Sequence, residues 1–192
     1  IILVEGNIDV VSLHQAGFDS AVASLGTSLT PEQARLISRY KNEVVIAYDA
    51  DAAGQKASQR AIGILEKLEL KVRVLTVKGA KDPDEFIKAK GAEAFQNLLA
   101  ESENHVEYRL DAVKAKYDLA TDEGKVGYLK DAAAVLAELP DRAAREVYAM
   151  RAASLCGVSP EAVQDEIKQL RRRKAASARR KDEREQLRPV RM

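Results

Sequence analysis

The sequence predicts an α/β fold, with a mostly parallel sheet flanked by helices and followed by a small all-helical bundle. Over residues 1–100, short apolar segments alternate with segments whose apolar residues recur at helical spacing. Beyond about residue 92 the strand signals stop and only helical segments follow. Strands separated by helices of about ten residues or more imply crossover connections, which make the strands parallel and place helices on the sheet faces.

Four strands are predicted, at 1–4, 20–25, 44–48 and 72–77. The first is wholly apolar, as expected for a strand that is buried on both faces. The third, with the sequence VVIAY, and the fourth, VRVLTV, are rich in β-branched residues, which favour strands.

Four helices alternate with these strands, at 8–16, 30–40, 52–68 and 82–91. The second helix has a clear start, because Thr30 is a good N-cap, Pro31 suits the first helical position and Gln33 completes a capping box. Further helices are predicted at 92–100, 103–118, 122–139, 141–156 and 160–174. We therefore expect an α/β domain over 1–100, a helical bundle over 101–170 and a basic helix end or linker over 171–192.

The composition limits the class of protein. Hydrophobic residues make up 46% of the chain, which is enough for a core, and no apolar run reaches the roughly 18 residues of a membrane-spanning helix. One cysteine and two histidines exclude a disulfide framework and a cysteine-based zinc site. We expect a cytoplasmic protein, and the apolar strand at the very start suggests a fragment of a longer chain.

Residues 171–192 form a basic tail, with ten Lys or Arg against three Asp or Glu, although the whole chain has a net charge of only +1. A charge run of this kind is more often a solvated helix end or linker than a nucleic-acid contact. The linker is therefore the favoured interpretation, and contact with nucleic acid stays open.

Six acidic residues follow the predicted strands closely. They are Glu5, Asp9, Asp49, Asp51, Asp82 and Asp84. Ligands of parallel α/β sheets bind beyond the carboxyl ends of the strands, so these side chains are expected at one edge. Each also has a simpler explanation: Asp51 and Asp82 could be helix N-caps, and Glu5-Gly6 could be an ordinary turn.

The six acids together favour a metal site. Two like charges about 4 Å apart repel by roughly 4 kcal/mol at an effective dielectric constant near 20. Several such repulsions would rival the about 5–15 kcal/mol by which a domain is stable, unless a cation offsets them. Ligands that are all oxygen select Mg²⁺, Mn²⁺ or Ca²⁺, and Mg²⁺ is the usual partner of phosphate chemistry. Gly54, Lys56, Lys78 and Lys81 lie near these acids and are candidate phosphate contacts.

Two of these segments resemble the signature of the Toprim family. Val4-Glu5-Gly6-Asn7-Ile8-Asp9 looks like its glutamate turn, and Asp49-Ala50-Asp51-Ala52-Ala53-Gly54 looks like its DxD turn. Toprim domains occur in topoisomerases, primases, small nucleases and recombination proteins. Three further segments, at 23–30, 48–57 and 81–85, narrow the resemblance to bacterial DNA primases of the DnaG type, over roughly residues 1–170.

The resemblance implies a metal-dependent nucleotidyltransferase that makes short RNA primers on single-stranded DNA from ribonucleoside triphosphates. It implies that Glu5, Asp49 and Asp51 are catalytic and bind metal most tightly, and that Asp9, Asp82 and Asp84 complete a second, looser site. Two or more Mg²⁺ or Mn²⁺ ions are expected.

The resemblance also implies what this chain lacks. Zinc would belong only to an N-terminal domain outside this chain, and the replicative helicase would bind a C-terminal domain that is also outside it. We expect a monomer that acts at the bacterial nucleoid.

Three alternatives stay open. A Toprim nuclease would use the same acids to cleave nucleic acid. A phosphatase with an aspartyl nucleophile also carries Asp-x-Asp after a strand, but after the first strand and with Thr or Val where Ala53 stands here. A fragment of a primase core could also bind metal or nucleotide without being active alone.

Overall fold

The structure, a computed structural model, describes residues 1–25, 28–77 and 79–186, which divide into a unit over Ile1–Tyr108 and a unit that begins at Arg109. Lys78, which was a candidate phosphate contact, lies outside the described residues. So do Gly26 and Thr27 and the last six residues of the predicted basic tail, 187–192.

The first unit contains a five-stranded sheet. Its strands are β1 (Ile2–Val4), β2 (Ala21–Ala23), β3 (Glu43–Ile46), β4 (Lys71–Val74) and β5 (Glu103–Asn104). Their order is β2-β1-β3-β4-β5, and every pair is parallel except β4–β5. The predicted α/β fold with a mostly parallel sheet is confirmed.

The strand β5 was not predicted, since residues 103–118 were expected to be helical. It is two polar residues long and carries no hydrophobic alternation, so the sequence gives no strand signal. It pairs with the free edge of β4, where Asn104 lies opposite Arg73 and Glu103 lies opposite Val74. Helix α5 (His105–Lys114) follows directly.

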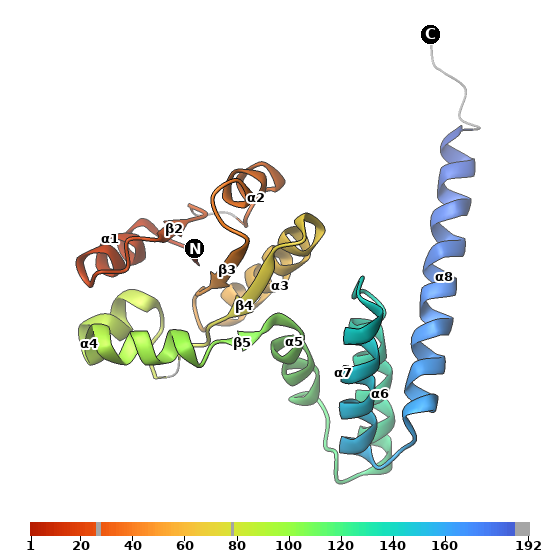
Figure 1. The fold of residues 1–192 in the computed structure, drawn as a ribbon. Coiled ribbons are helices and arrows are strands. Elements are labelled where there is room, and N and C mark those ends of the chain that lie inside the picture. The colour runs from red at the N-terminus through yellow and green to blue at the C-terminus, as the bar shows by residue number, and fades with distance from the viewer. Residues whose placement is uncertain (26–27, 78, 187–192) are drawn as a thin grey trace. The chain divides into compact units, whose positions relative to one another are not determined.

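Helices cover both faces of the sheet, giving three layers (Figure 1). They are α1 (Asn7–Gln15), α2 (Pro31–Ser38), α3 (Ala52–Leu65) with the 3₁₀ turn η1 (Glu66–Leu68), and α4 (Pro83–Ala100). The predicted capping box at α2 is present, with Gln33 N donating to Thr30 Oγ1 at 3.2 Å and Thr30 N to Gln33 Oε1 at 2.9 Å. Gly91 interrupts α4 with a φ of 82°, where the sequence predicted a break between two helices.

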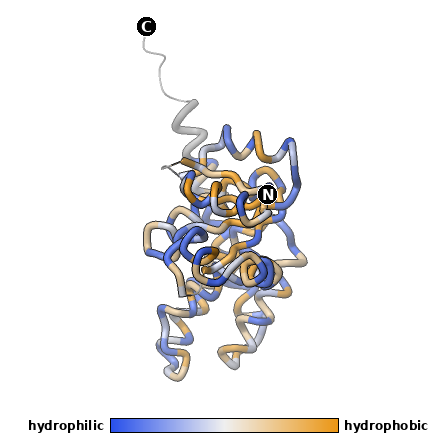
Figure 2. The backbone as a smooth tube through the Cα atoms, turned by 90° about the vertical axis from the view of Figure 1, so that its left-hand side faces the viewer, coloured by the Kyte–Doolittle hydropathy of each residue, from blue (hydrophilic) through white to orange (hydrophobic). Residues whose placement is uncertain are grey.

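Each face of the sheet has its own core. Leu3, Val44 and Ile46 pack with α2 and α3 on one face, and Ile2 and Val4 pack with α1 and α4 on the other. Hydrophilic and hydrophobic stretches alternate along the chain (Figure 2). Strand β3 begins with Glu43 and β4 carries Lys71 and Arg73, whereas β1 is hydrophobic throughout and its residues face the two cores in turn. This alternation of buried residues across β1 is the pattern of a strand covered on both sides.

The second unit is helical, with α6 (Asp122–Leu136), α7 (Arg142–Cys156) and α8 (Pro160–Gln186) packed against one another. Two arginines donate hydrogen bonds to carbonyl groups that directly follow α6. Arg145 Nη1 donates to the Leu139 and Pro140 carbonyls at 2.6 and 2.9 Å, and Arg171 Nη1 donates to the Ala137 carbonyl at 2.9 Å. Among the residues that the structure describes, no helix is long and apolar enough to cross a membrane.

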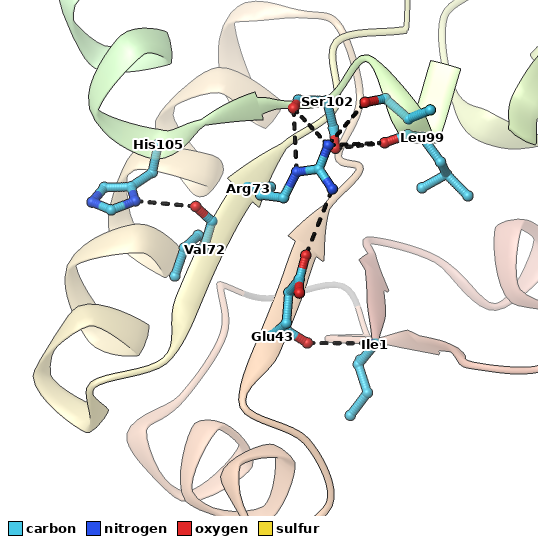
Figure 3. Close-up of polar contacts among 8 residues, drawn as sticks. Ile1, Glu43, Val72, Arg73, Leu99, Ser102 and His105 are labelled. Carbon is cyan, nitrogen blue, oxygen red and sulfur yellow. Dashed lines mark hydrogen bonds and ion pairs between the residues drawn. The ribbon is translucent and has the colours of Figure 1, made fainter. Parts of the chain in front are cut away.

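Arg73 on β4 contacts the end of α4 and the segment before β5 (Figure 3). Its guanidinium donates to the Leu99, Ala100 and Ser102 carbonyls at 3.0–3.3 Å, and Nη1 lies 3.6 Å from Glu43 Oε1. A strand residue thus satisfies carbonyl groups that the C-terminal end of α4 leaves without helical partners. This contact holds α4 and β5 to β4.

We expect Arg73→Met to lower the free energy of unfolding by about 1–2 kcal/mol, because hydrogen bonds from a charged donor are lost while the side-chain stem stays. Urea denaturation measures the change. The matched control is Arg35→Met, which removes only an exposed pair with Glu32 at 3.7 Å and should cost less than about 0.5 kcal/mol. Equal losses in the two variants would contradict the role given to Arg73.

Candidate metal centre

The predicted acids meet at the carboxyl edge of the sheet. Glu5 follows β1 directly, and Asp49 lies three residues after β3. Asp49 N donates to Glu5 Oε1 at 3.2 Å, which joins these two neighbouring strand ends. Ala50 N donates to the Lys81 carbonyl at 2.9 Å, which brings the segment before α4 to the same place.

Asp9 links α1 to the start of α4. Only 6% of it is exposed, and its two carboxylate oxygens accept from Gly6 N at 3.2 Å and from Asp84 N at 3.3 Å. Asp84 in turn bonds to the Ser12 hydroxyl and forms an ion pair with Lys88 at 2.7 Å. Asp9 and Asp84 are therefore tied into a network between two helices.

Asp51 and Asp82 are helix N-caps, the simpler explanation that the sequence left open. Asp51 Oδ1 accepts from Gly54 N and Asp82 Oδ1 accepts from Glu85 N, both at 2.8 Å. A cap bond occupies one lone pair of a carboxylate that has about four, so capping leaves capacity for a cation. Capping and metal binding are compatible for both residues.

The pKa shifts of the acids show that several of them lie close together. The pKa of Asp49 is raised to about 6, first by burial and then by the charges of Glu5, Asp9, Asp82 and Asp51. Burial also raises the pKa of Asp9 against the effect of its two backbone donors. Hydrogen bonds from Lys88 and Ser12 lower the pKa of Asp84. The negative charges of four neighbouring acids thus act on Asp49 together with its burial.

The acids lie in the same region of the sheet edge, but their side chains do not converge on one point. Within 1–25, 28–77 and 79–186, no three Asp, Glu, His or Cys side chains are close enough together to hold a metal ion. The residues brought together by direct bonds are Glu5 with the Asp49 backbone, and Asp9 with Asp84.

Gly54 is required by the close approach of α3 to this edge. A Cβ atom on Gly54 would lie 2.2 Å from the Asp49 carbonyl oxygen and 2.9 Å from Glu5 Oε1. Its N–H is bonded to Asp51. The close approach that the sequence suggested for a ligand is thus made to the backbone of Asp49.

The two remaining candidate phosphate contacts differ in their surroundings. Lys56 lines a cavity together with Glu5. The Lys81 backbone bonds to the segments around it, its N–H to Glu85 at 2.6 Å and its carbonyl to Ala50, and its side chain is exposed.

Sequence reasoning missed three residues of this region. Lys88 lies four residues after Asp84, a spacing that favours ion pairs on a helix and could have identified it. Ser12 is 72 residues from Asp84 in the chain, so no local signal connects them. Tyr48 is buried and lines the same cavity as Glu5.

We expect Gly54→Ala to lower the free energy of unfolding by about 1–3 kcal/mol, because α3 must move away from Asp49. Gly63→Ala is the matched control in the same helix. No atom lies within 4 Å of the Cβ that it adds, and it should stabilise the protein by about 0.5–1 kcal/mol through helix propensity. Thermal or urea unfolding measures both, and a neutral Gly54→Ala would contradict the close packing.

We expect Asp49→Asn to stabilise the metal-free protein at pH 7.5 and to have no effect at about pH 3, below the pKa of the unfolded chain. The folded state raises the pKa of Asp49 from 3.8 to about 6, so it binds the proton more tightly than the unfolded chain does. Folding stability therefore falls as the pH rises from about 4 to above 6, and the variant lacks this loss.

Melting temperatures in EDTA across this pH range measure the effect. We expect a gain of about 2–5 °C at pH 7.5, since partial exposure of Asp49 reduces the repulsion. Asp19→Asn, an exposed residue before β2 at the opposite edge of the sheet, is the control. A constant difference between wild type and Asp49→Asn at every pH would show that the charge is not the cause.

The chain matches two protein families. Residues 2–87 match the Toprim-like family, and residues 106–161 match the DnaB-helicase binding domain of primase. The second match corrects the expectation that a helicase-binding domain lies only outside this chain. The helical character of 103–174 was predicted, but no motif in it indicated a helicase.

Curated relatives are bacterial DNA primases. The chain is 39% identical over 167 residues to the DNA primase of Clostridium acetobutylicum, which covers 87% of this chain and 28% of the relative. It is 36% identical over 169 residues to that of Deinococcus radiodurans, covering 87% and 30%. The chain thus spans less than a third of the length of these relatives.

Solved structures of primases share the fold. A DNA primase domain from Pseudomonas aeruginosa is 31% identical with a TM-score of 0.73, covering 90% of this chain and 54% of that one. The zinc-binding and RNA polymerase domains of the Aquifex aeolicus primase are also 31% identical, with a TM-score of 0.66 and coverage of 84% and 38%. The chain therefore belongs to the DnaG-type DNA primases, whose Toprim domain and following helical region it carries.

Proposed function

We propose that this chain provides the metal-binding part of the catalytic core of a primase, which makes short RNA primers on single-stranded DNA during replication. The observation that carries the proposal is the meeting of Glu5, Asp49 and the start of α4 at the carboxyl edge of a Toprim sheet. The substrates would be a single-stranded DNA template and ribonucleoside triphosphates, and the product an RNA primer. Primer synthesis would take place in the bacterial cytoplasm, at the nucleoid.

The donor set fits Mg²⁺ or Mn²⁺. All candidate ligands are carboxylates, which are hard oxygen donors. Burial and then the charges of the neighbouring acids raise the pKa of Asp49, and a divalent cation would offset the negative charge gathered there. Mg²⁺ usually keeps several waters and binds one or two carboxylates directly, so it does not need three side chains to converge on one point.

We assign Glu5, Asp49 and Asp51 to the tighter ion and Asp9, Asp82 and Asp84 to a looser one. Asp9 and Asp84 are already engaged by backbone N–H groups, Ser12 and Lys88, which would weaken their hold on a cation. When bound, the ions would supply positive charge to the reacting phosphates.

The residues of this chain have three tasks in the reaction. The Asp49 N–H orients Glu5, and the cap bonds fix Asp51 and Asp82 at the helix starts. Lys56 and Lys81 would contact phosphate oxygens beside these acids. In the reaction, the 3′-hydroxyl of one ribonucleotide attacks the α-phosphate of the next, and pyrophosphate leaves.

We propose a replicative helicase as the protein partner. The support is the match of residues 106–161 to the DnaB-helicase binding domain of primase. One solved relative, the DnaG primase catalytic domain, is bound to single-stranded DNA, and it is 28% identical to this chain with a TM-score of 0.70. This relative supports the template as a ligand of the longer protein.

We expect saturable Mn²⁺ binding in calorimetry, weakened at least about tenfold in Asp49→Asn/Asp51→Asn, which loses two ligands of the tighter ion. Asn is as good an N-cap as Asp, so the double variant should keep α3. The control is Asp19→Asn/Asp122→Asn, which removes the same charge from two exposed positions.

Equal binding by the two folded double variants would refute the metal centre. Primer synthesis by the protein that contains this chain is the second measurement, and Asp49→Asn/Asp51→Asn should abolish it. Metal-dependent cleavage of nucleic acid, without primer synthesis, would instead favour the Toprim nuclease.

A further inference from the structure

The second unit carries a cavity with a volume of about 240 Å³, which is lined by residues of α7 and α8. Its charged lining residues are Arg142, Arg145 and Glu146 on α7 and Lys168 and Arg171 on α8. Four cations and one carboxylate give this lining a surplus of positive charge, so an anion is the kind of ligand that it favours. We call it the α7–α8 cavity.

Two of these cations are held in place by neutral acceptors. Arg145 and Arg171 both donate to the Leu139 carbonyl, at 2.6 and 3.2 Å. Burial and then the positive charge of Arg171 lower the pKa of Arg145, ahead of the opposing charges of Asp141 and Glu146, so the two guanidinium groups lie close together. Among the side chains that the structure describes, neither arginine forms an ion pair. An anion in the cavity would offset their mutual repulsion.

A row of cations continues from the cavity along α8. Arg172 and Arg179 lie four and eleven residues after Lys168, which are spacings that return to the same side of an α-helix. From Lys168 to Arg179 the helix rises by about 17 Å, at about 1.5 Å per residue. We call these three residues the basic stripe. Residues 171–180 contain six Lys or Arg and no Asp or Glu, and all ten are exposed.

Most of the stripe lies where α8 no longer packs against the bundle. Val163 and Ile167 are buried, whereas 171–180 are exposed throughout, and Figure 1 shows α8 running past the ends of α6 and α7. Bases on an exposed helix are often paired with acids three or four residues away. The four bases at 171–174 have no acid at these spacings, so this part of the helix does not neutralise its own charge.

The chemistry of this surface fits a nucleic acid strand better than an acidic protein. Interfaces between proteins have an apolar core that is rich in aromatic residues, whereas residues 175–178, between Arg172 and Arg179, are three alanines and a serine. Nucleic acid backbones are bound chiefly by Lys and Arg, and the planar donor fork of arginine matches a phosphate group. We propose that the α7–α8 cavity and the basic stripe together bind the phosphate backbone of a nucleic acid strand. The site consists of residues of the second unit alone, so it does not depend on the metal centre.

The test is fluorescence anisotropy of a labelled oligothymidylate of about 20 nucleotides, titrated with the protein in EDTA between about 50 and 200 mM salt. We expect Arg172→Gln/Arg179→Gln to raise the dissociation constant at least about fivefold. The slope of the logarithm of affinity against the logarithm of salt concentration should also become shallower by about 1.4, since each lost contact with a single strand contributes about 0.7.

The matched control is Lys116→Gln/Lys130→Gln. It removes the same charge from exposed residues of the same unit, outside the cavity and the stripe, and should change the dissociation constant less than about twofold. All four substituted residues are exposed, so both variants should keep the wild-type melting temperature.

Glu146→Gln provides a signature of the opposite sign. It removes the acid of the cavity lining and frees Arg142, with which Glu146 pairs at 3.1 Å. Binding of the oligonucleotide should therefore tighten at least about twofold. Glu123→Gln, which removes the same charge from the exposed first turn of α6, should have a smaller effect. Equal effects of the two substitutions would exclude the cavity from the site.

The proposal is overturned if wild type does not bind the oligonucleotide at about 50 mM salt. It is also overturned if the stripe variant and its control lose equal affinity, which would mean a general attraction of the charged surface. Polyglutamate tests the acidic protein. We expect it not to displace the oligonucleotide at an equal concentration of charge, and displacement would overturn the assignment to nucleic acid.

Failure of the metal centre would be distinct from failure of this site. The assay contains no free divalent metal, so Asp49→Asn/Asp51→Asn should bind the oligonucleotide at least as tightly as wild type does. Arg172→Gln/Arg179→Gln should in turn keep Mn²⁺ binding. Calorimetry with Mn²⁺ and anisotropy in EDTA therefore report separately on the two sites.

Discussion

Repulsion between carboxylates at one edge of the sheet is the constraint on which the rest of the first unit depends. Backbone N–H groups offset part of it: those of Gly6, Asp49, Gly54, Asp84 and Glu85 each donate to one of the acids. Helices α1, α3 and α4 all begin at this edge, so their positive dipole ends point toward the same charges. Without metal, these backbone donors hold the acids, while burial and the neighbouring carboxylates still raise the pKa of Asp49.

The parallel sheet explains why the position of the acids at one edge could be predicted. In a parallel sheet every strand ends at the same edge, so an acid that follows a strand in the sequence must lie there in space. The apolar runs at 1–4, 44–48 and 72–77 located β1, β3 and β4 within a few residues, and the acids after them followed. The sequence does not distinguish a helix N-cap from a metal ligand at Asp51 and Asp82, because aspartate can serve either purpose.

Features that depend on contacts distant in the chain could not be predicted. Strand β5 forms because it pairs with the free edge of β4 and because Arg73 bonds to Ser102 just before it. Neither contact can be recognised from the sequence of residues 103–104. The bond between Ser12 and Asp84 likewise connects two helices that are adjacent only after folding. Gly54 was predicted as a phosphate contact, and no local pattern specifies that the Asp49 carbonyl lies against it.

Helix α3 organises both kinds of charge around Glu5. Its cap, Asp51, adds a carboxylate to the acidic edge, and Gly54 lets its first turn come close to Asp49 and Glu5. One turn later the helix presents Lys56 and then Arg60 to a cavity that Glu5 also lines. Anything that moves the start of α3 would therefore change the acids and the cations together.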